Sequence, residues 1–173
     1  MNIDVIKNSI RDIPDFPKPG IMFKDITPVL KDKKVFSYCI DLLSEKVKTA
    51  NAEYICGTES RGFIFGSAIA YKTGLGFIPV RKPGKLPADT YKIKYQLEYG
   101  SNILEIHKDA LPVNAKVVVV DDLLATGGTA KATAELVERC GAHVVSVLFL
   151  VELTFLKGRD ALKNYPVDTI ISF

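Results

Sequence analysis

The sequence predicts an α/β fold in which a parallel β-sheet is flanked by helices. Three observations support this prediction. The length of 173 residues suits one domain with a substantial core. From residue 32 onward, helix-like patterns alternate with short apolar runs, which favours parallel strands joined by crossover helices. One run, Val117 to Val120, consists only of β-branched residues, as is typical of a strand covered on both faces.

The N-terminal half begins with Ile3, Ile6, Ile10 and Ile13, whose spacing predicts an amphipathic helix. Residues 15–28 are rich in proline and glycine, and we expect them to be irregular. The elements expected next are a helix over 32–50, a strand over 54–57, a helix over 62–72 and a strand over 76–81. A loop over 82–89, which contains two prolines and a glycine, follows them.

The C-terminal half continues the alternation. Two candidate strands, 90–97 and 102–107, flank a possible hairpin turn at residues 98–100. We then expect a strand over 116–121 and a helix over 128–140, which Gly141 is well placed to end. A long apolar strand over 143–153, a short helix near 156–164 and a last strand over 167–172 complete the prediction.

The composition limits the classes of function. A net charge of +3, from 23 basic and 20 acidic residues, is too weak to favour nucleic acid as the main partner. No apolar run approaches the ~18 residues of a membrane span, and the first residues carry charges where a signal peptide would be apolar. Cys39, Cys56 and Cys140 are widely spaced among apolar residues. We expect reduced core thiols in a cytoplasmic protein.

The segment with the clearest chemistry follows the β-branched run. Asp121 and Asp122 come first, then Thr126 to Thr129 (TGGT), then the expected helix. Ligands bind at the carboxyl ends of strands in open α/β sheets. Successive N–H groups of a glycine turn at a helix N-terminus form an anion site, and the acids can hold hydroxyls or a metal. A compact ligand that carries both hydroxyls and a phosphate is a phosphorylated ribose.

Three other interpretations of this segment account for less of it. An ordinary acidic loop would leave the acids, glycines and threonines without a shared reason. A Walker B acid would need a partner glycine-rich phosphate loop ending in Lys-Ser or Lys-Thr, and the sequence has none. A phospho-acceptor aspartate does not account for the Thr126–Thr129 turn.

Two other predicted strands also end in polar residues. Thr58 to Gly62 (TESRG) follows one of them, and Arg81 to Lys85 (RKPGK) follows another. Because the carboxyl ends of parallel strands share one edge of a sheet, we expect these residues to face the same site as the acids. Four cations beside a phosphate turn suggest a second anion of higher charge, such as pyrophosphate: Arg61, Arg81, Lys82 and Lys85.

These motifs together resemble those of a known family. Val119 to Thr129 (VVDDLLATGGT) is similar to the phosphoribosyl-diphosphate signature of the type I phosphoribosyltransferases. Phe16 to Pro28 (FPKPGIMFKDITP) resembles the base-binding segment of the adenine-specific members. Further matches occur in the same order, and the resemblance covers nearly the whole chain: residues 59–63 (ESRGF), 81–85 (RKPGK), 97–100 (LEYG) and 104–111 (LEIHKDAL).

The resemblance implies transfer of a 5-phosphoribosyl group from phosphoribosyl diphosphate to adenine, which gives AMP and pyrophosphate in purine salvage. It implies magnesium (Mg2+) carried on the diphosphate and a homodimer, and no role for nucleic acid or membrane. It also implies the type I phosphoribosyltransferase fold, in a single domain over 1–173. That domain would comprise a small N-terminal hood over about 1–30, a core over about 31–173 and a mobile active-site loop over about 83–100.

The resemblance further implies roles for individual residues. Asp121 and Asp122 would hold the ribose hydroxyls. The 5′-phosphate would lie on the turn formed by Ala125, Thr126, Gly127, Gly128 and Thr129. The diphosphate would be bound by Ser60, Arg61, Arg81, Lys82 and Lys85, one of which could reach across a dimer interface. Phe23 would stack on adenine, the Met22 backbone would read its Watson–Crick edge, and Glu98 would act as acid or base on a loop shared with Tyr99. We interpret His107 as structural.

Two positions bear on the choice of base. Related enzymes for 6-oxopurines usually carry an acid where this chain has Ala125, so alanine favours adenine. Lys24 stands where the family often has arginine, and lysine offers no planar two-pronged contact. Two alternatives stay open from the sequence: a regulator that senses phosphoribosyl diphosphate, and a phosphoribosyltransferase for another base.

Overall fold

The computed structural model describes residues 1–96 and 101–173. The chain divides into two compact units, Met1–Leu42 and Leu43–Phe173. In the described residues, no helix has the length and apolar character to cross a membrane.

The N-terminal unit differs in part from the sequence prediction. Helix α1 (Ile3–Ser9) is shorter than expected, and Ile13 belongs to a strand, β1 (Arg11–Ile13), which pairs antiparallel with β2 (Phe23–Asp25). The expected irregular segment therefore contains a strand. A short helix, α2 (Thr27–Lys31), begins with Pro28 in its first turn, where a missing N–H costs nothing. Helix α3 (Lys33–Thr49) matches its prediction and crosses the boundary between the units.

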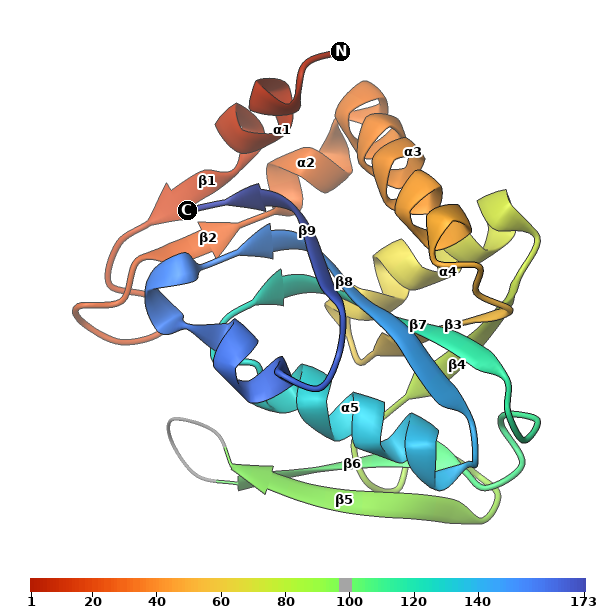
Figure 1. Ribbon diagram of the computed structural model, residues 1–173. Helices are drawn as coiled ribbons and strands as arrows, with labels where there is room; N and C mark the ends of the chain where they lie inside the picture. The colour runs from red at the N-terminus through yellow and green to blue at the C-terminus, as the bar shows by residue number, and fades with distance from the viewer. Residues whose placement is uncertain (97–100) are drawn as a thin grey trace. The chain divides into compact units, whose positions relative to one another are not determined.

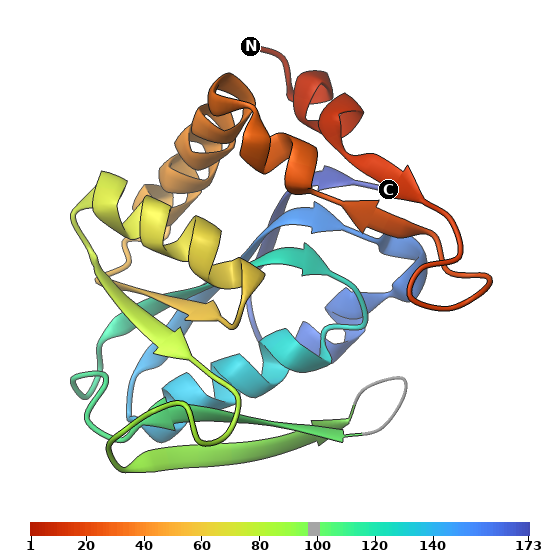
Figure 2. The same ribbon diagram turned by 180° about the vertical axis from the view of Figure 1, so that it is seen from behind.

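The second unit is built on a five-stranded parallel sheet of order β4-β3-β7-β8-β9, as the sequence predicts (Figure 1). Its strands are β3 (Tyr54–Thr58), β4 (Gly76–Val80), β7 (Lys116–Leu124), β8 (His143–Glu152) and β9 (Val167–Ser172). Helices α4 (Arg61–Thr73) and α5 (Gly128–Arg139) cover opposite faces of this sheet (Figure 2). The short helix expected near 156–164 consists of two 3-10 turns, η1 (Thr154–Leu156) and η2 (Gly158–Leu162).

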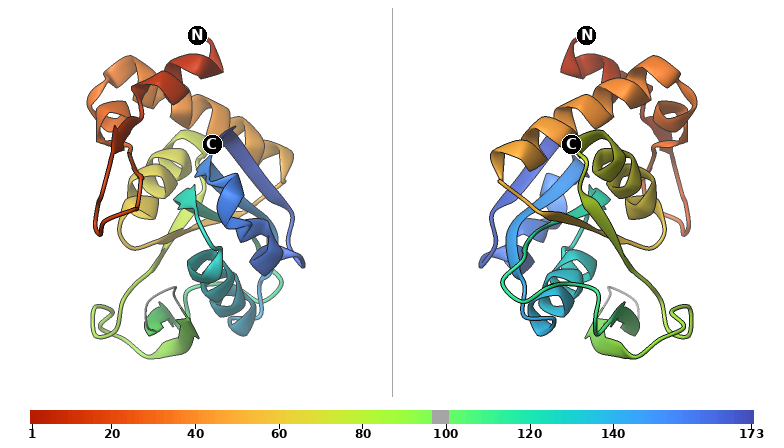
Figure 3. Two further views of the ribbon diagram at one scale, coloured as in Figure 1. Left: turned by 90° about the vertical axis from the view of Figure 1, so that its left-hand side faces the viewer. Right: turned by 90° about the vertical axis from the view of Figure 1, so that its right-hand side faces the viewer.

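An antiparallel hairpin lies outside the central sheet. Strands β5 (Thr90–Gln96) and β6 (Ser101–His107) pair in register from Thr90–His107 to Gln96–Ser101. Helix α5 lies between this hairpin and the sheet (Figures 1 and 3). The hairpin thereby covers the face of α5 that the sheet leaves open.

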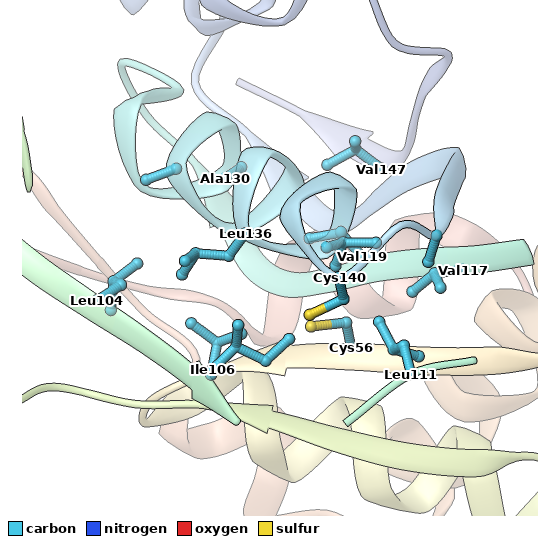
Figure 4. Packing of buried hydrophobic residues seen from close by; sticks show 14 of the residues in the cluster. Cys56, Leu104, Ile106, Leu111, Val117, Val119, Ala130, Leu136, Cys140 and Val147 are labelled. Carbon is cyan, nitrogen blue, oxygen red and sulfur yellow. The ribbon is translucent and has the colours of Figure 1, made fainter. Parts of the chain in front are cut away.

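The alternation of side chains along β7 explains how one strand serves two faces. Val117 and Val119 join the buried cluster on the α5 side, together with Leu136 of α5 and Ile106 of β6 (Figure 4). Val118 and Val120 are equally buried but point to the other face, since side chains alternate along a strand. The unbroken valine run is thus the sequence of a strand covered on both sides.

The three cysteines are buried free thiols, as the sequence predicts. Cys56 of β3 and Cys140 at the end of α5 point toward each other inside the same cluster (Figure 4). Burial raises the pKa of both thiols, so they remain protonated packing groups at neutral pH.

A pair of buried hydroxyls joins α5 to the sheet. Thr133 donates to the carbonyl of Thr129 at 3.0 Å, so Thr58 must donate to the Thr133 hydroxyl, 2.9 Å away. Both side chains are at most 1% exposed. We expect Thr133→Val to lower the free energy of unfolding by about 1–3 kcal/mol, because it leaves the buried hydroxyl of Thr58 without a hydrogen-bond acceptor.

The matched variant is Thr58→Val, which leaves Thr133 its acceptor on Thr129 and should cost less than half as much. Chemical denaturation of both variants measures the two losses. A larger loss in Thr58→Val than in Thr133→Val would contradict this account of the hydrogen bonds.

Candidate active site

Three neighbouring strands end at one edge of the sheet, as the sequence predicts. Strand β3 lies between β4 and β7, and all three run parallel. The segments that follow them begin at Glu59, Arg81 and Ala125. The acids, the basic residues and the glycine turn of the second unit therefore belong to one edge.

Asp121 and Asp122 lie within β7 rather than after it, which corrects the expected strand end at residue 121. Strand β3 pairs with β7 only as far as Gly57 with Val120, whereas β8 accompanies β7 on to Leu124. Past Val120 the two acids therefore have a paired neighbour on one side only. On the β3 side, Gly62 approaches so closely that an added Cβ would lie 2.9 Å from the Asp121 carboxylate.

The environment of these two carboxyls disfavours their charge. Burial, and next the charge of Asp122, raise the pKa of Asp121 well above its ordinary value. Burial also raises the pKa of Asp122, although its carboxylate lies 2.8 Å from the Arg61 guanidinium. Asp121 accepts a hydrogen bond from the Asp122 N–H at 2.9 Å. Such a pair is suited to a ligand that supplies hydroxyl donors or positive charge.

The glycine turn leads directly into α5. Gly127 has a φ of 83°, a value that side chains disfavour, and it caps the helix. No acidic side chain occupies the first turn of α5. The turn from Ala125 to Thr129 thus places backbone N–H groups and the Thr126 hydroxyl at the positive end of a twelve-residue helix, which is an arrangement suited to phosphate.

Gly158 supports this turn, and no motif in the sequence indicates that role. A Cβ on Gly158 would overlap the carbonyl oxygen of Ala125, and one on Gly127 would overlap the carbonyl of Gly158. Arg159, the next residue, binds Glu152 of β8 through two hydrogen bonds of 2.8 Å. The η2 turn is therefore fixed on β8 while its backbone packs against the glycine turn. The only sequence signal was a glycine inside a short helical segment.

Tyr95 is a second residue near the turn that no sequence motif indicates. Its hydroxyl accepts a hydrogen bond from the Thr129 hydroxyl at 3.3 Å. A further contact joins the same elements, because Arg139 donates to the Lys92 carbonyl at 2.8 Å. The β5–β6 hairpin is thus tied to α5 near both ends of the helix.

The basic segment Arg81–Lys85 is held by two buried carboxylates. Glu59 accepts from the Arg81 side chain at 3.3 Å, the Lys82 N–H at 3.0 Å and the Lys85 ammonium at 2.5 Å. Glu105 accepts from the Gly84 N–H at 3.3 Å and pairs with Lys92 at 2.8 Å. Arg81 and Lys85 therefore share one counter-charge, while Lys82 is exposed.

The α4 side of the site contains Ser60 and Arg61. Ser60 precedes the first residue of α4, and its peptide bond with Glu59 is cis. Arg61 begins the helix and forms an ion pair with Asp122. A residue predicted to bind diphosphate is thus paired with one predicted to bind ribose.

The N-terminal unit holds the residues predicted to bind a base. Phe23 is half-buried and makes an edge contact with Phe16, with ring centroids 5.1 Å apart. The neighbouring Met22 is 48% exposed. Lys24 of β2 lies opposite Asp12 of β1, and its ammonium forms a 2.6 Å ion pair with the Asp12 carboxylate. Glu98 and Tyr99, the predicted acid or base and its neighbour, lie outside the described residues.

The described part of the second unit can therefore bind a strongly anionic sugar. It offers a helix-capped phosphate turn, two adjacent carboxyls for hydroxyls, and basic side chains on the two neighbouring strand ends. In the part of the chain that the structure describes, no three His, Cys, Asp or Glu side chains are grouped to hold a metal ion.

Comparison with known proteins gives consistent matches. Residues 26–171 match the phosphoribosyl transferase domain family. The chain is 56% identical over its full length to the adenine phosphoribosyltransferase of Caldanaerobacter subterraneus subsp. tengcongensis, which it also covers completely.

Solved structures match as well. The crystal structure of the adenine phosphoribosyltransferase from Thermoanaerobacter pseudethanolicus superposes with a TM-score of 0.97 at 55% identity, over 99% of this chain and 100% of that one. The enzyme of Saccharomyces cerevisiae, solved with adenine and D-2,5-dideoxy-2,5-imino-altritol 1,6-bisphosphate, gives 0.91 at 42% identity over 98% of both chains. The chain therefore belongs to the adenine phosphoribosyltransferases of the type I phosphoribosyltransferase family.

Proposed function

We propose that this chain transfers the 5-phosphoribosyl group of phosphoribosyl diphosphate to adenine and releases AMP and pyrophosphate. The observation that carries the proposal is the continuous path from Asp121 and Asp122 into the glycine turn at the start of α5. Groups suited to hydroxyls and groups suited to phosphate thereby follow one another along a short stretch of chain, as the hydroxyls and the 5′-phosphate of one ribose require. Full-length similarity to adenine phosphoribosyltransferases supports adenine as the base.

The sugar-phosphate half of the site would hold the C1 atom of the ribose in one position. Ala125 to Thr129 hold the 5′-phosphate, and Asp121 and Asp122 accept hydrogen bonds from the ribose hydroxyls. When the bond between C1 and the diphosphate breaks, the sugar becomes oxocarbenium-like, as in glycoside chemistry. Nearby carboxylates favour that positive charge. A sugar held at both ends also presents C1 to the attacking nitrogen at a high effective concentration.

The diphosphate half would stabilise the leaving group, which gains negative charge as the bond breaks. We assign this role to the Arg61, Arg81, Lys82 and Lys85 side chains and to Ser60 at the start of α4. Mg2+, when bound, neutralises diphosphate charge. We propose that its ligands come mainly from the substrate, as suits a cation that keeps several waters. The hard oxygen donors of Asp121 and Asp122 fit such an ion beside the ribose.

The base would be bound by the N-terminal unit. We propose that Phe23 stacks on adenine, that the Met22 backbone reads its edge, and that Lys24 acts through its ion pair with Asp12. From the sequence resemblance we assign the proton taken from the base to Glu98, with Tyr99 beside it. A hood over about 1–30, a core over about 31–173 and a mobile loop over about 83–100 remain part of this proposal. So do a homodimer and a cytoplasmic location, which the three free cysteines support.

A panel of free bases tests the proposed reaction. With phosphoribosyl diphosphate and Mg2+, we expect adenine to be converted to AMP and pyrophosphate, and hypoxanthine, guanine, xanthine and uracil to react at least about 100-fold more slowly. Turnover of another base in preference to adenine would assign a different transferase. Tight DNA or RNA binding without any transfer would favour the phosphoribosyl-diphosphate-sensing regulator.

The half-buried carboxyl of Asp121, whose pKa is raised, should destabilise the unliganded protein at neutral pH. Its folded-state pKa is raised, so the folded chain holds this proton more tightly than the unfolded chain does, and stability is lost as pH rises above the ordinary value of 3.8. Asp121→Asn should therefore increase the free energy of unfolding at pH 7. The gain should shrink as pH falls toward 3.8 and vanish below that value, where the carboxyl is neutral in both states.

Denaturation at pH 3 to 8 measures this gain, with Asp109→Asn as the control because Asp109 is exposed. The same Asp121 variant should lose most of its transfer activity. A variant less stable than wild type at pH 7 would show that Asp121 is there to hold the fold.

Gly158→Ala tests the support of the phosphate turn. The added methyl would push on the Ala125 carbonyl and the Leu124 side chain, at a cost of about 1–3 kcal/mol. We expect AMP and ribose 5-phosphate to bind roughly 10-fold more weakly, by calorimetry. Gly76→Ala is the control, since its methyl would meet only the Tyr54 ring at the amino end of β4. An equal loss of AMP affinity in both variants would contradict a local role for Gly158.

A further inference from the structure

The basic segment Arg81–Lys85 concentrates three cations within five residues of chain. Arg81 and Lys85 are part-exposed, and their side chains are 33% and 46% accessible. Three like charges so close together repel one another, so the segment needs a counter-charge to keep one conformation. In the structure that counter-charge is the Glu59 carboxylate, which is only 9% exposed.

Both oxygens of Glu59 are in use. Oε1 accepts from the Lys85 ammonium, and Oε2 accepts from the Arg81 guanidinium and the Lys82 N–H. Burial opposes ionisation of Glu59, but the hydrogen bonds from Lys85 and the Lys82 N–H outweigh it and hold its pKa below the ordinary value. The carboxylate is thus ionised whenever the segment is folded on it at neutral pH.

The backbone fixes Glu59 itself. Its N–H donates to the Val80 carbonyl at 2.9 Å, which joins the end of β3 to the end of β4. On the far side of the segment, Arg81 exchanges two backbone hydrogen bonds with Glu105, at 2.8 and 3.0 Å. Glu59 therefore works from a rigid position and sets where Arg81, Lys82 and Lys85 lie.

We propose that Glu59 is a positioning residue that folds the basic segment Arg81–Lys85 into its diphosphate-binding arrangement. The proposal rests on the assignment of this segment to the diphosphate under the proposed function. Both oxygens of Glu59 are bonded to the basic segment, so its role is to position that segment. It organises the donors in advance, so that a diphosphate meets them already placed, and Lys82 is left with an exposed ammonium for the ligand.

A second effect of the Glu59 carboxylate opposes positioning, because Glu59 competes with the diphosphate for the same cations. Glu59 occupies two cations that a diphosphate would attract, so removing its charge would strengthen anion binding if competition were the larger effect. The three separate hydrogen bonds, all from groups of the same short segment, favour positioning. The two effects predict opposite changes in pyrophosphate affinity.

The test compares Glu59→Gln, Glu59→Asp and a matched control, Glu53→Gln. Glu53 precedes the same strand at its other end and also accepts a neighbouring N–H, from Lys116 at 2.8 Å. Calorimetry measures pyrophosphate and AMP binding, and steady-state assays give KM and kcat. For Glu59→Gln we expect pyrophosphate affinity to fall about 10-fold and KM for phosphoribosyl diphosphate to rise similarly, while AMP affinity changes less than twofold.

Glu59→Asp should recover part of the pyrophosphate affinity, because it keeps the charge, and Glu53→Gln should behave as wild type. Unchanged or tighter pyrophosphate binding by Glu59→Gln would overturn the proposal, as would an equal loss of AMP affinity, which would indicate general damage to the fold. If wild-type protein formed no AMP from adenine, the proposed function would fail. The pyrophosphate affinities of the Glu59 variants would still decide the role of Glu59.

Discussion

The structure depends on one strand that runs further than its neighbour. Strand β7 is paired on both sides as far as Val120 and on the β8 side alone through Leu124. That overhang places Asp121 and Asp122 beyond the cover of β3 while keeping them in the regular backbone of a strand, with Asp122 buried and Asp121 half-buried. Their raised pKa values reflect the cost of holding two adjacent acids there. A ligand that donates hydroxyls, or a cation, would offset this cost, as the proposed function requires.

The surrounding elements keep the overhang and its turn in place. Gly62 lets α4 approach Asp121, and Gly158 lets η2 pack against the carbonyl of Ala125, so backbone contacts backbone where a side chain would intervene. Glu59 and Glu105 fix the basic segment on the next strand ends. Polar side chains at one sheet edge are thereby oriented by neighbouring groups of the protein.

The parallel sheet, its helices and the shared edge of three strand ends could be predicted from the sequence, because the β-branched run and the alternating patterns are local signals. The hairpin of β5 and β6 was also predicted. The predicted end of the N-terminal helix was wrong, because Ile10 and Ile13 continue a helical spacing that the pairing of β1 with β2 overrides. The extent of β7, the ties of Arg61 to Asp122 and of Glu59 to Lys85, and the packing of Gly158 depend on residues distant in sequence. No local pattern could indicate them.

The central claim is that the overhanging acids recognise ribose hydroxyls next to a phosphate turn. Calorimetric binding of ribose 5-phosphate and 2-deoxyribose 5-phosphate to wild type and to Asp122→Asn tests it most directly. We predict that wild type prefers the ribose compound by roughly 10-fold or more, as the loss of a hydrogen bond to a charged group implies, and that the variant loses most of this preference while still binding the phosphate. An equal preference in both proteins would contradict the claim.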